Sequence, residues 1–213
     1  MRKVYIFSGL GVDKRVLEKI DFGDIEIEFV DWITPIHNES IQAYAKRISS
    51  NFDFKKPILI GLSFGGIMAV EISKLIDTKK VILIASAKNK NEIPFIYRTL
   101  GKLKLNRIIP TSLIQQPNII LYWMFGIKHK GDKNLLKKIL KDTDIHFTKW
   151  AINEILHWKS SKSPINCVHI HGSSDRILPI KNIHPDFIIK NGGHFMTVNK
   201  AKEVSQIIKS ILH

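Results

Sequence analysis

Short, strongly apolar segments alternate with helical patterns along most of this chain, and this alternation limits the possible folds more than any other feature. The clearest apolar segment, 57–62 (PILIGL), has no charged residue and is typical of a strand buried on both faces. Similar strands are expected at 3–8, 25–32, 80–86, 165–171 and 186–190. The pattern predicts an α/β fold, a mostly parallel sheet flanked by helices on both faces.

The helices between these strands are marked by apolar residues at helical spacing. One helical pattern opens at Asp13, another covers 40–50, a third begins directly after Ser63, and the last lies near the C-terminal end. Segment 25–32 alternates apolar and acidic residues, which is typical of a strand near the edge of a sheet.

The alternation stops for about 70 residues after the strand at 80–86, so an insertion is expected there, over about 88–159. Its clearest helix carries an aromatic and aliphatic stripe formed by Phe147, Trp150, Ala151, Ile155 and Trp158. We therefore predict a helical cap with an apolar underside, inserted into one domain.

The size and composition of the chain fit a single domain over 1–213. Its 213 residues, 44% of them hydrophobic, suffice for one buried core and are few for two. The apolar stretch at the N-terminal end is brief, ends at Ser8 and Gly9, and lacks a small-residue cleavage site. It therefore predicts a first strand rather than a signal peptide, and we expect a cytoplasmic protein.

Three features could indicate other classes of protein. The net charge of +14 is spread along the whole chain, so no nucleic-acid partner is expected. The most membrane-like run, 108–127, is interrupted by Pro110, Pro117 and two glutamines, so no membrane span is expected. The single cysteine, Cys167, lies in an apolar strand-like segment and is predicted to be a small buried side chain. The oligomeric state is left open.

The turn after segment 57–62 carries the strongest chemical signal. Residues 61–65 (GLSFG) fit the pattern G-x-S-x-G between a strand and a helix, the context that a nucleophile elbow requires. The glycines on either side of Ser63 leave room where a side chain would collide with the backbone, and Gly66 allows close helix packing. We predict that Ser63 is a nucleophile; the alternative is an ordinary glycine-bracketed turn.

A serine hydroxyl needs a base, and His194 follows the last predicted strand within the segment NGGHF. The third member of a triad is a carboxylate that fixes the histidine tautomer. Asp175, after the strand at 165–171, is the preferred candidate, and Glu92, after the strand at 80–86, is the runner-up. The chain order of serine, acid and histidine supports this assignment.

Two backbone N–H groups are also needed to bind an oxyanion. We expect them at Phe64, directly after Ser63, and at Leu10, in the glycine-rich loop after the first strand. His169 and His171 share one face of a strand and could ligate a metal together with Asp175, but no further cluster completes such a site, so no metal is expected.

Taken together, the segments FSGLG, GLSFGG, HGSSDRILP and GGHF resemble the α/β-hydrolase superfamily, across nearly the whole chain. The resemblance implies a cap at about 88–159 and a trimmed sheet of about six strands, because the chain starts at the strand equivalent to the superfamily's third. Ser8 stands where many members have a histidine before the glycine. The residues that the resemblance assigns are Ser63, Asp175 and His194 as the triad, and Leu10 and Phe64 as the oxyanion hole.

These residues predict that Ser63 attacks a carboxylic ester or thioester and forms an acyl-enzyme, with no cofactor. The apolar insertion predicts a small-molecule substrate with an apolar group. Acyl transfer and carbon-carbon bond hydrolysis use the same residues in this superfamily and stay open. The alternative from another class is a ligand-binding protein of the same fold without turnover.

Overall fold

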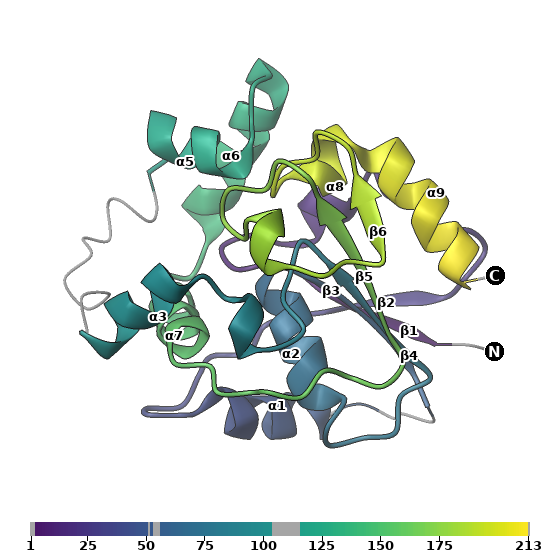
Figure 1. Cartoon of the computed structure of the whole chain (residues 1–213), viewed down its shortest axis with the longest axis vertical. Coiled ribbons are helices and arrows are strands. Elements are labelled where there is room, and N and C mark those ends of the chain that lie inside the picture. Colours follow the sequence, from purple (N-terminus) through teal and green to yellow (C-terminus); the bar gives the residue numbers. More distant parts are fainter. Residues whose placement is uncertain (1–2, 51, 53–55, 104–115, 213) are drawn as a thin grey trace.

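The frame of the molecule is a six-stranded sheet, seen in a computed structural model that describes residues 3–50, 52, 56–103 and 116–212. The strands lie in the order β2-β1-β3-β4-β5-β6, and every neighbouring pair is parallel (Figure 1). Their bounds are β1 (Val4–Phe7), β2 (Ile27–Val30), β3 (Ile58–Leu62), β4 (Lys80–Ile84), β5 (Cys167–Gly172) and β6 (Phe187–Ile189). The predicted parallel sheet of about six strands is confirmed.

Helices cover both faces of this sheet. The helices α1 and α2 lie on one face, and α8 and α9 lie on the other (Figure 1). The α-helices described are α1 (Ile41–Ser49), α2 (Phe64–Ile72), α3 (Phe95–Lys102), α5 (Ile119–Phe125), α6 (Lys130–Asp142), α7 (Ile145–Leu156), α8 (Met196–Asn199) and α9 (Ala201–Leu212). The 3₁₀ turns are η1 (Lys14–Leu17), η2 (Lys90–Glu92) and η4 (Ile180–Asn182).

Two hydrophobic clusters hold these layers together, one on each face of the sheet. Successive side chains of a strand point to opposite faces, so Val4 and Ile6 of β1 belong to one cluster while Tyr5 and Phe7 belong to the other. The central strands β3 and β4 are buried along nearly their whole length. The edge strand β2 pairs only with β1 and is largely half-buried, as its alternating sequence predicts.

The helix predicted to open at Asp13 is shorter than the pattern indicated. Asp13 does cap it, since its carboxylate accepts the Arg15 N–H at 3.0 Å, but only one 3₁₀ turn follows. That single turn already buries Val16 and Leu17 against the sheet. The Ile20 N–H then donates to the Leu17 carbonyl at 3.0 Å. The Ile20 side chain is buried too, although Ile20 lies outside the 3₁₀ turn. Helical spacing over seven residues therefore marked burial rather than helix length.

The predicted insertion lies between β4 and β5, where α3, α5, α6 and α7 are found among the described residues (Figure 1). Residues 108–115 of the membrane-like run lie outside the described residues. The rest of that run contains α5, which has seven residues. Within the described ranges, no helix is long and apolar enough to cross a membrane.

Candidate active site

The predicted site residues all follow strands of the parallel sheet, so they gather at its carboxyl edge. Leu10 follows β1, Ser63 follows β3, Asp175 follows β5 and His194 follows β6. Residues far apart in the sequence thereby become neighbours at one edge.

Ser63 lies between β3 and α2 in a backbone conformation that L-residues rarely adopt, with φ 52° and ψ −117°. Such a conformation costs of the order of 1–3 kcal/mol and persists only where the surroundings enforce it. Here the Ser63 N–H donates to the Ile84 carbonyl at 2.9 Å, and the Ser63 carbonyl accepts from the Ser86 hydroxyl at 2.7 Å. The neighbouring strand β4 therefore holds the turn that carries Ser63.

The glycines around Ser63 are required by close backbone approach, as the sequence predicts. A Cβ at Gly61 would collide with the backbone of Gly65 and Gly66. A Cβ at Gly65 would collide with the carbonyl oxygens of Phe7 and Ser8 at the end of β1. Only glycine permits this packing of the turn against the first strand.

His194 is buried and connects the other two residues. Its Nε2 lies 2.8 Å from Ser63 Oγ, and its Nδ1 lies 2.7 Å from Asp175 Oδ2. Because an ionised carboxylate can only accept, Nδ1 carries the proton and Nε2 is free to accept the hydroxyl proton. The loop that presents His194 turns at Asn191, which has φ 58°. The structure thus joins Ser63, His194 and Asp175 in one line of hydrogen bonds.

Asp175 is buried at the start of a turn that binds its second oxygen. Oδ1 accepts the N–H groups of Ile177 and Leu178, each at 2.9 Å. Burial alone would raise the pKa of Asp175, but His194, His171 and the Leu178 N–H together hold that pKa below its ordinary value. The carboxylate therefore stays ionised beside His194 near neutral pH.

Two buried histidines of β5, His169 and His171, lie near Asp175. The only role that the sequence suggested for them was metal ligation. His171 Nε2 lies 2.8 Å from the Leu178 carbonyl and 3.6 Å from Asp175 Oδ2. His171 Nδ1 lies 3.3 Å from His169 Nε2. Burial lowers the pKa of both imidazoles, so they are neutral. In the part of the chain that the structure describes, no group of three or more His, Cys, Asp or Glu side chains could hold a metal ion.

His171 is therefore a site residue whose role the sequence reasoning missed. The sequence signal for this role was the position of His171 near the end of β5, four residues before Asp175. Its Nε2–H donates to the Leu178 carbonyl and so braces the turn whose N–H groups bind Asp175.

Glu92, the runner-up acid, lies elsewhere. Its carboxylate accepts the Lys88 N–H at 2.5 Å and the His184 N–H at 3.4 Å. Burial raises the pKa of Glu92. It makes no hydrogen bond to His194 among the described contacts, so it organises the loop after β4.

Cys167 is half-buried in β5, packed against the cluster that contains α1 and α2. Burial raises the pKa of its thiol to about 12, so little thiolate is present near neutral pH.

The two predicted oxyanion donors have the expected backbone positions. Phe64 is the first residue of α2, where helix N–H groups have no partner within the helix. Leu10 lies in the loop between β1 and η1 and lines the same cavity as Ser63 and His194. Among the hydrogen bonds of the described residues, neither N–H is a donor.

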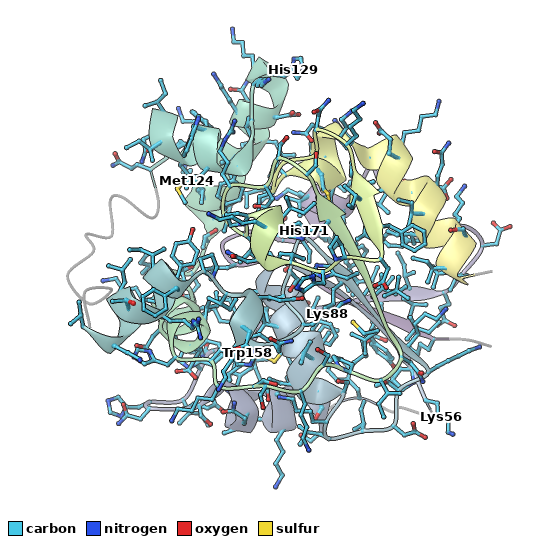
Figure 2. All side chains as sticks on the ribbon, in the orientation of Figure 1. Lys56, Lys88, Met124, His129, Trp158 and His171 are labelled. Atoms are coloured by element: carbon cyan, nitrogen blue, oxygen red, sulfur yellow. The ribbon has the colours of Figure 1, made fainter. Side chains whose placement is uncertain are left out.

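A cavity of about 400 Å³ lies over Ser63 and His194. Its walls come from both the sheet edge and the insertion, and none of the described residues that line it is Asp, Glu, Lys or Arg. Phe125 of α5 contacts the edge of the His194 ring, with centroids 5.6 Å apart. The side chains contributed by the insertion include Leu121, Met124 (labelled in Figure 2), Phe125, Ile152 and Ile155.

The backbone resembles several solved structures, although no family model and no curated protein matches the sequence. A lipase-esterase related protein from Clostridium acetobutylicum has a TM-score of 0.69 and 15% identity, covering 98% of this chain and 93% of that one. A thermophilic esterase from Thermogutta terrifontis has a TM-score of 0.65 and 15% identity, covering 100% and 89%. A meta-cleavage product hydrolase from Pseudomonas fluorescens has a TM-score of 0.67 and 13% identity, covering 100% and 90%. These proteins share the arrangement of sheet and helices over nearly the whole chain.

Proposed function

Because this chain has the α/β-hydrolase fold, we propose that it is a serine hydrolase that cleaves a carboxylic ester or thioester. The observation that carries the proposal is the hydrogen-bonded line from Ser63 Oγ through His194 to Asp175, at 2.8 and 2.7 Å. This line begins at a serine held in a strained turn and lies at the base of an apolar cavity. A buried base oriented by a buried acid is the arrangement that activates a serine hydroxyl.

In the proposed reaction, Ser63 Oγ forms a bond to the substrate carbonyl carbon while His194 Nε2 takes the hydroxyl proton. The tetrahedral intermediate collapses, the bond to the alcohol or thiol breaks, and His194 returns the proton to that leaving group. Water then gives a proton to His194 and attacks the acyl-enzyme, which releases a carboxylic acid and regenerates Ser63. Asp175 stabilises the imidazolium in both halves of the reaction.

The backbone N–H groups of Phe64 and Leu10 are the proposed oxyanion donors. The Phe64 N–H lies at the N-terminal end of α2, whose dipole favours negative charge at that point. One such donor contributes a factor of about 10²–10³ in kcat in well-studied serine hydrolases.

The proposed substrate is a small molecule with an uncharged, apolar acyl or alcohol group. The cavity walls are largely apolar and include Leu121, Ile152 and Ile155 from the insertion and Leu10 and Leu62 from the sheet edge. The described lining has no Asp, Glu, Lys or Arg to pair with a carboxylate or ammonium group, so burying one there costs several kcal/mol. The inserted helices are the proposed cap, because they supply half of the apolar side chains that line the cavity.

The proposal is tested by treating the purified protein with a fluorophosphonate probe and locating the adduct by peptide mass spectrometry. We expect one adduct, at Ser63, and no adduct in the Ser63→Ala and His194→Ala variants. Ser174→Ala is the matched control, because Ser174 is exposed beside Asp175 and has no part in the proposed reaction. An unlabelled wild-type protein, or labelling that persists in His194→Ala at the wild-type rate, would refute an activated Ser63.

A screen of p-nitrophenyl esters and acyl thioesters then defines the reaction. Loss of at least 10⁴-fold in kcat/KM, about the size seen for triad variants, is expected for Ser63→Ala. Product analysis with an added alcohol distinguishes acyl transfer from hydrolysis. Labelling without turnover of any ester or thioester would favour the ligand-binding alternative or carbon-carbon bond cleavage.

A further inference from the structure

The inserted helix α5 is apolar around its whole circumference, and none of its seven residues is buried. On the inner side, Met124 and Phe125 line the cavity over Ser63. On the outer side, Ile119, Ile120 and Trp123 are 82%, 66% and 60% exposed. Adjacent large apolar side chains at such exposure mark a surface that binds another apolar phase.

Cations surround these exposed side chains. Residues 116–141 contain six lysines and a single acid, Asp132, which is buried. Lys128 and Lys133 lie with Ile119 and Trp123 around one shallow hollow of about 190 Å³, whose described lining includes no acidic residue.

The aromatic rings of α5 hold Lys133 and a further cation, Arg176, close to the apolar side chains. The Lys133 ammonium lies 5.3 Å from the centre of the Tyr122 ring, and the Arg176 guanidinium lies 4.7 Å from the centre of the Trp123 ring. Arg176 also donates to the Trp123 carbonyl at 2.7 Å, so it fixes one end of α5 next to Asp175. The positive charges and the exposed apolar side chains therefore lie together on one surface of α5.

We propose that this α5 surface, formed by Ile119, Ile120, Trp123, Lys128 and Lys133, docks the protein on an anionic phospholipid bilayer. Isoleucine and tryptophan side chains partition into the region between lipid headgroups and acyl chains, while lysines bind lipid phosphates. A nucleic acid would leave the isoleucines in water, so a lipid surface fits both halves of the α5 surface better.

Two further features agree with this occupant. The other side of α5 lines the apolar cavity, so docking brings the cavity next to the lipid. The helix α3 lies, like α5, at the left of the view in Figure 1. It exposes Phe95 and Ile96 by 73% and 61%, with the Arg98 guanidinium 5.7 Å from the Phe95 ring centre.

Binding is measured with the full chain by co-sedimentation with vesicles of phosphatidylcholine alone and of phosphatidylcholine with about a third phosphatidylglycerol. We expect binding to the anionic vesicles that weakens with salt, and at least about tenfold weaker binding to the neutral ones. Quenching of Trp123 fluorescence by brominated lipid, lost in Trp123→Phe, would locate the contact at α5. Turnover is not required, so Ser63→Ala is expected to bind as the wild type does, and the outcome is independent of the proposed reaction.

Paired variants separate the α5 surface from net charge and general hydrophobicity. Lys128→Glu with Lys133→Glu is expected to weaken binding at least about 25-fold, since each lysine near an anionic surface contributes about fivefold. Its control is Lys79→Glu with Lys162→Glu, which makes the same change in net charge at exposed positions before β4 and β5.

Ile119→Ser with Ile120→Ser is expected to weaken binding about tenfold, because it removes apolar area from the contact. Its control is Leu75→Ser with Ile165→Ser, which also lie exposed but on other parts of the surface. Equal binding to both vesicle types, or equal losses in the test and control pairs, would overturn the proposal. So would a dimer in light scattering that the Ile119→Ser, Ile120→Ser pair dissociates, since a second copy would then cover the α5 surface.

Discussion

The turn that carries Ser63 and the helix α5 border the same cavity, but the turn is packed far more tightly than the helix. A Cβ added at Gly61 or Gly65 would lie within 2.4 Å of backbone atoms, so these two positions have no room for one more carbon. Helix α5 has no fully buried residue. Its Leu121, Tyr122 and Phe125 pack half-buried against the core, and its backbone carbonyls accept from Arg176 at 2.7 Å and from the Phe195 N–H at 3.1 Å.

This contrast suggests that the two regions serve the site in different ways. Positions that must hold reacting atoms to within fractions of an ångström lie on buried strands and their turns, where packing enforces geometry. Surfaces that only need to be apolar lie on the insertion, where several shapes serve equally well. Substitutions at the sheet edge should therefore affect rate and folding, whereas those in the insertion should affect selectivity.

The largest expected effect tests the acid at the sheet edge. Asp175→Asn should lower kcat about 10⁴-fold with the fold retained, because an amide does not fix the productive tautomer of His194. Glu92→Gln, an equally buried carboxylate without a bond to His194, should change kcat no more than about threefold. Steady-state kinetics together with circular dichroism measure both. The reverse ranking would make Glu92 the acid and Asp175 a turn residue.

The next effect tests the backbone packing of the turn. Gly65→Ala should reduce the free energy of unfolding by about 3 kcal/mol, because its Cβ meets the carbonyls of Phe7 and Ser8. Gly131→Ala in α6 is the matched control, since nothing lies within 4 Å of its Cβ and alanine favours a helix by about 1 kcal/mol. Urea unfolding of both variants measures the difference. A Gly65→Ala protein as stable as the wild type would show that the turn is not tightly packed.

A smaller effect concerns the neutral histidines behind Asp175. Burial lowers the pKa of His169 and His171 below the ordinary 6.5, so the unfolded chain binds protons that the native state does not. Stability is then fully present well above pH 6.5 and falls as the pH decreases through that value, by about 1 kcal/mol per histidine over the first pH unit below it. Urea unfolding near neutral pH and about one to two units lower measures this slope.

The control for this slope is an exposed histidine. His169→Phe should flatten the pH dependence, whereas His146→Gln, on the exposed side of α7, should leave it unchanged. An unchanged slope in His169→Phe would mean that the buried imidazoles are not the groups that bind protons on unfolding.

The smallest effect belongs to the insertion. Met124→Ala should shift the preference among acyl esters toward longer or bulkier chains by about tenfold, because it enlarges the cavity by a few methylene groups. The kcat for a short ester should remain within about threefold, since Met124 makes no bond to the reacting residues. Ile165→Ala, a fully exposed position, should have no effect on selectivity. A loss of kcat for all esters alike would place Met124 among the residues that position His194.

Much of the fold could be predicted from local patterns. Buried strands such as 57–62 are continuous in apolar residues because both faces of a parallel sheet are covered, and the six predicted strands are all present. The pattern predicted too long a helix after Asp13, because a single 3₁₀ turn buries Val16 and Leu17 and the chain beyond it buries Ile20 without a helix. Burial is what the sequence encodes directly, and the length of an element depends on what it packs against.

The sequence by itself determined the residue types of the candidate site and their order along the strands. Glycines around Ser63 and the positions of Asp175 and His194 are local features, because they depend on turns that follow strands. The sequence preferred Asp175 to Glu92, but only the tertiary structure shows Asp175 bonded to His194, the bracing by His171 and the exposure of α5. Each depends on which strands are neighbours and where the inserted helices pack. Such contacts join residues far apart in the chain, so no local hydrophobic pattern in the sequence reveals them.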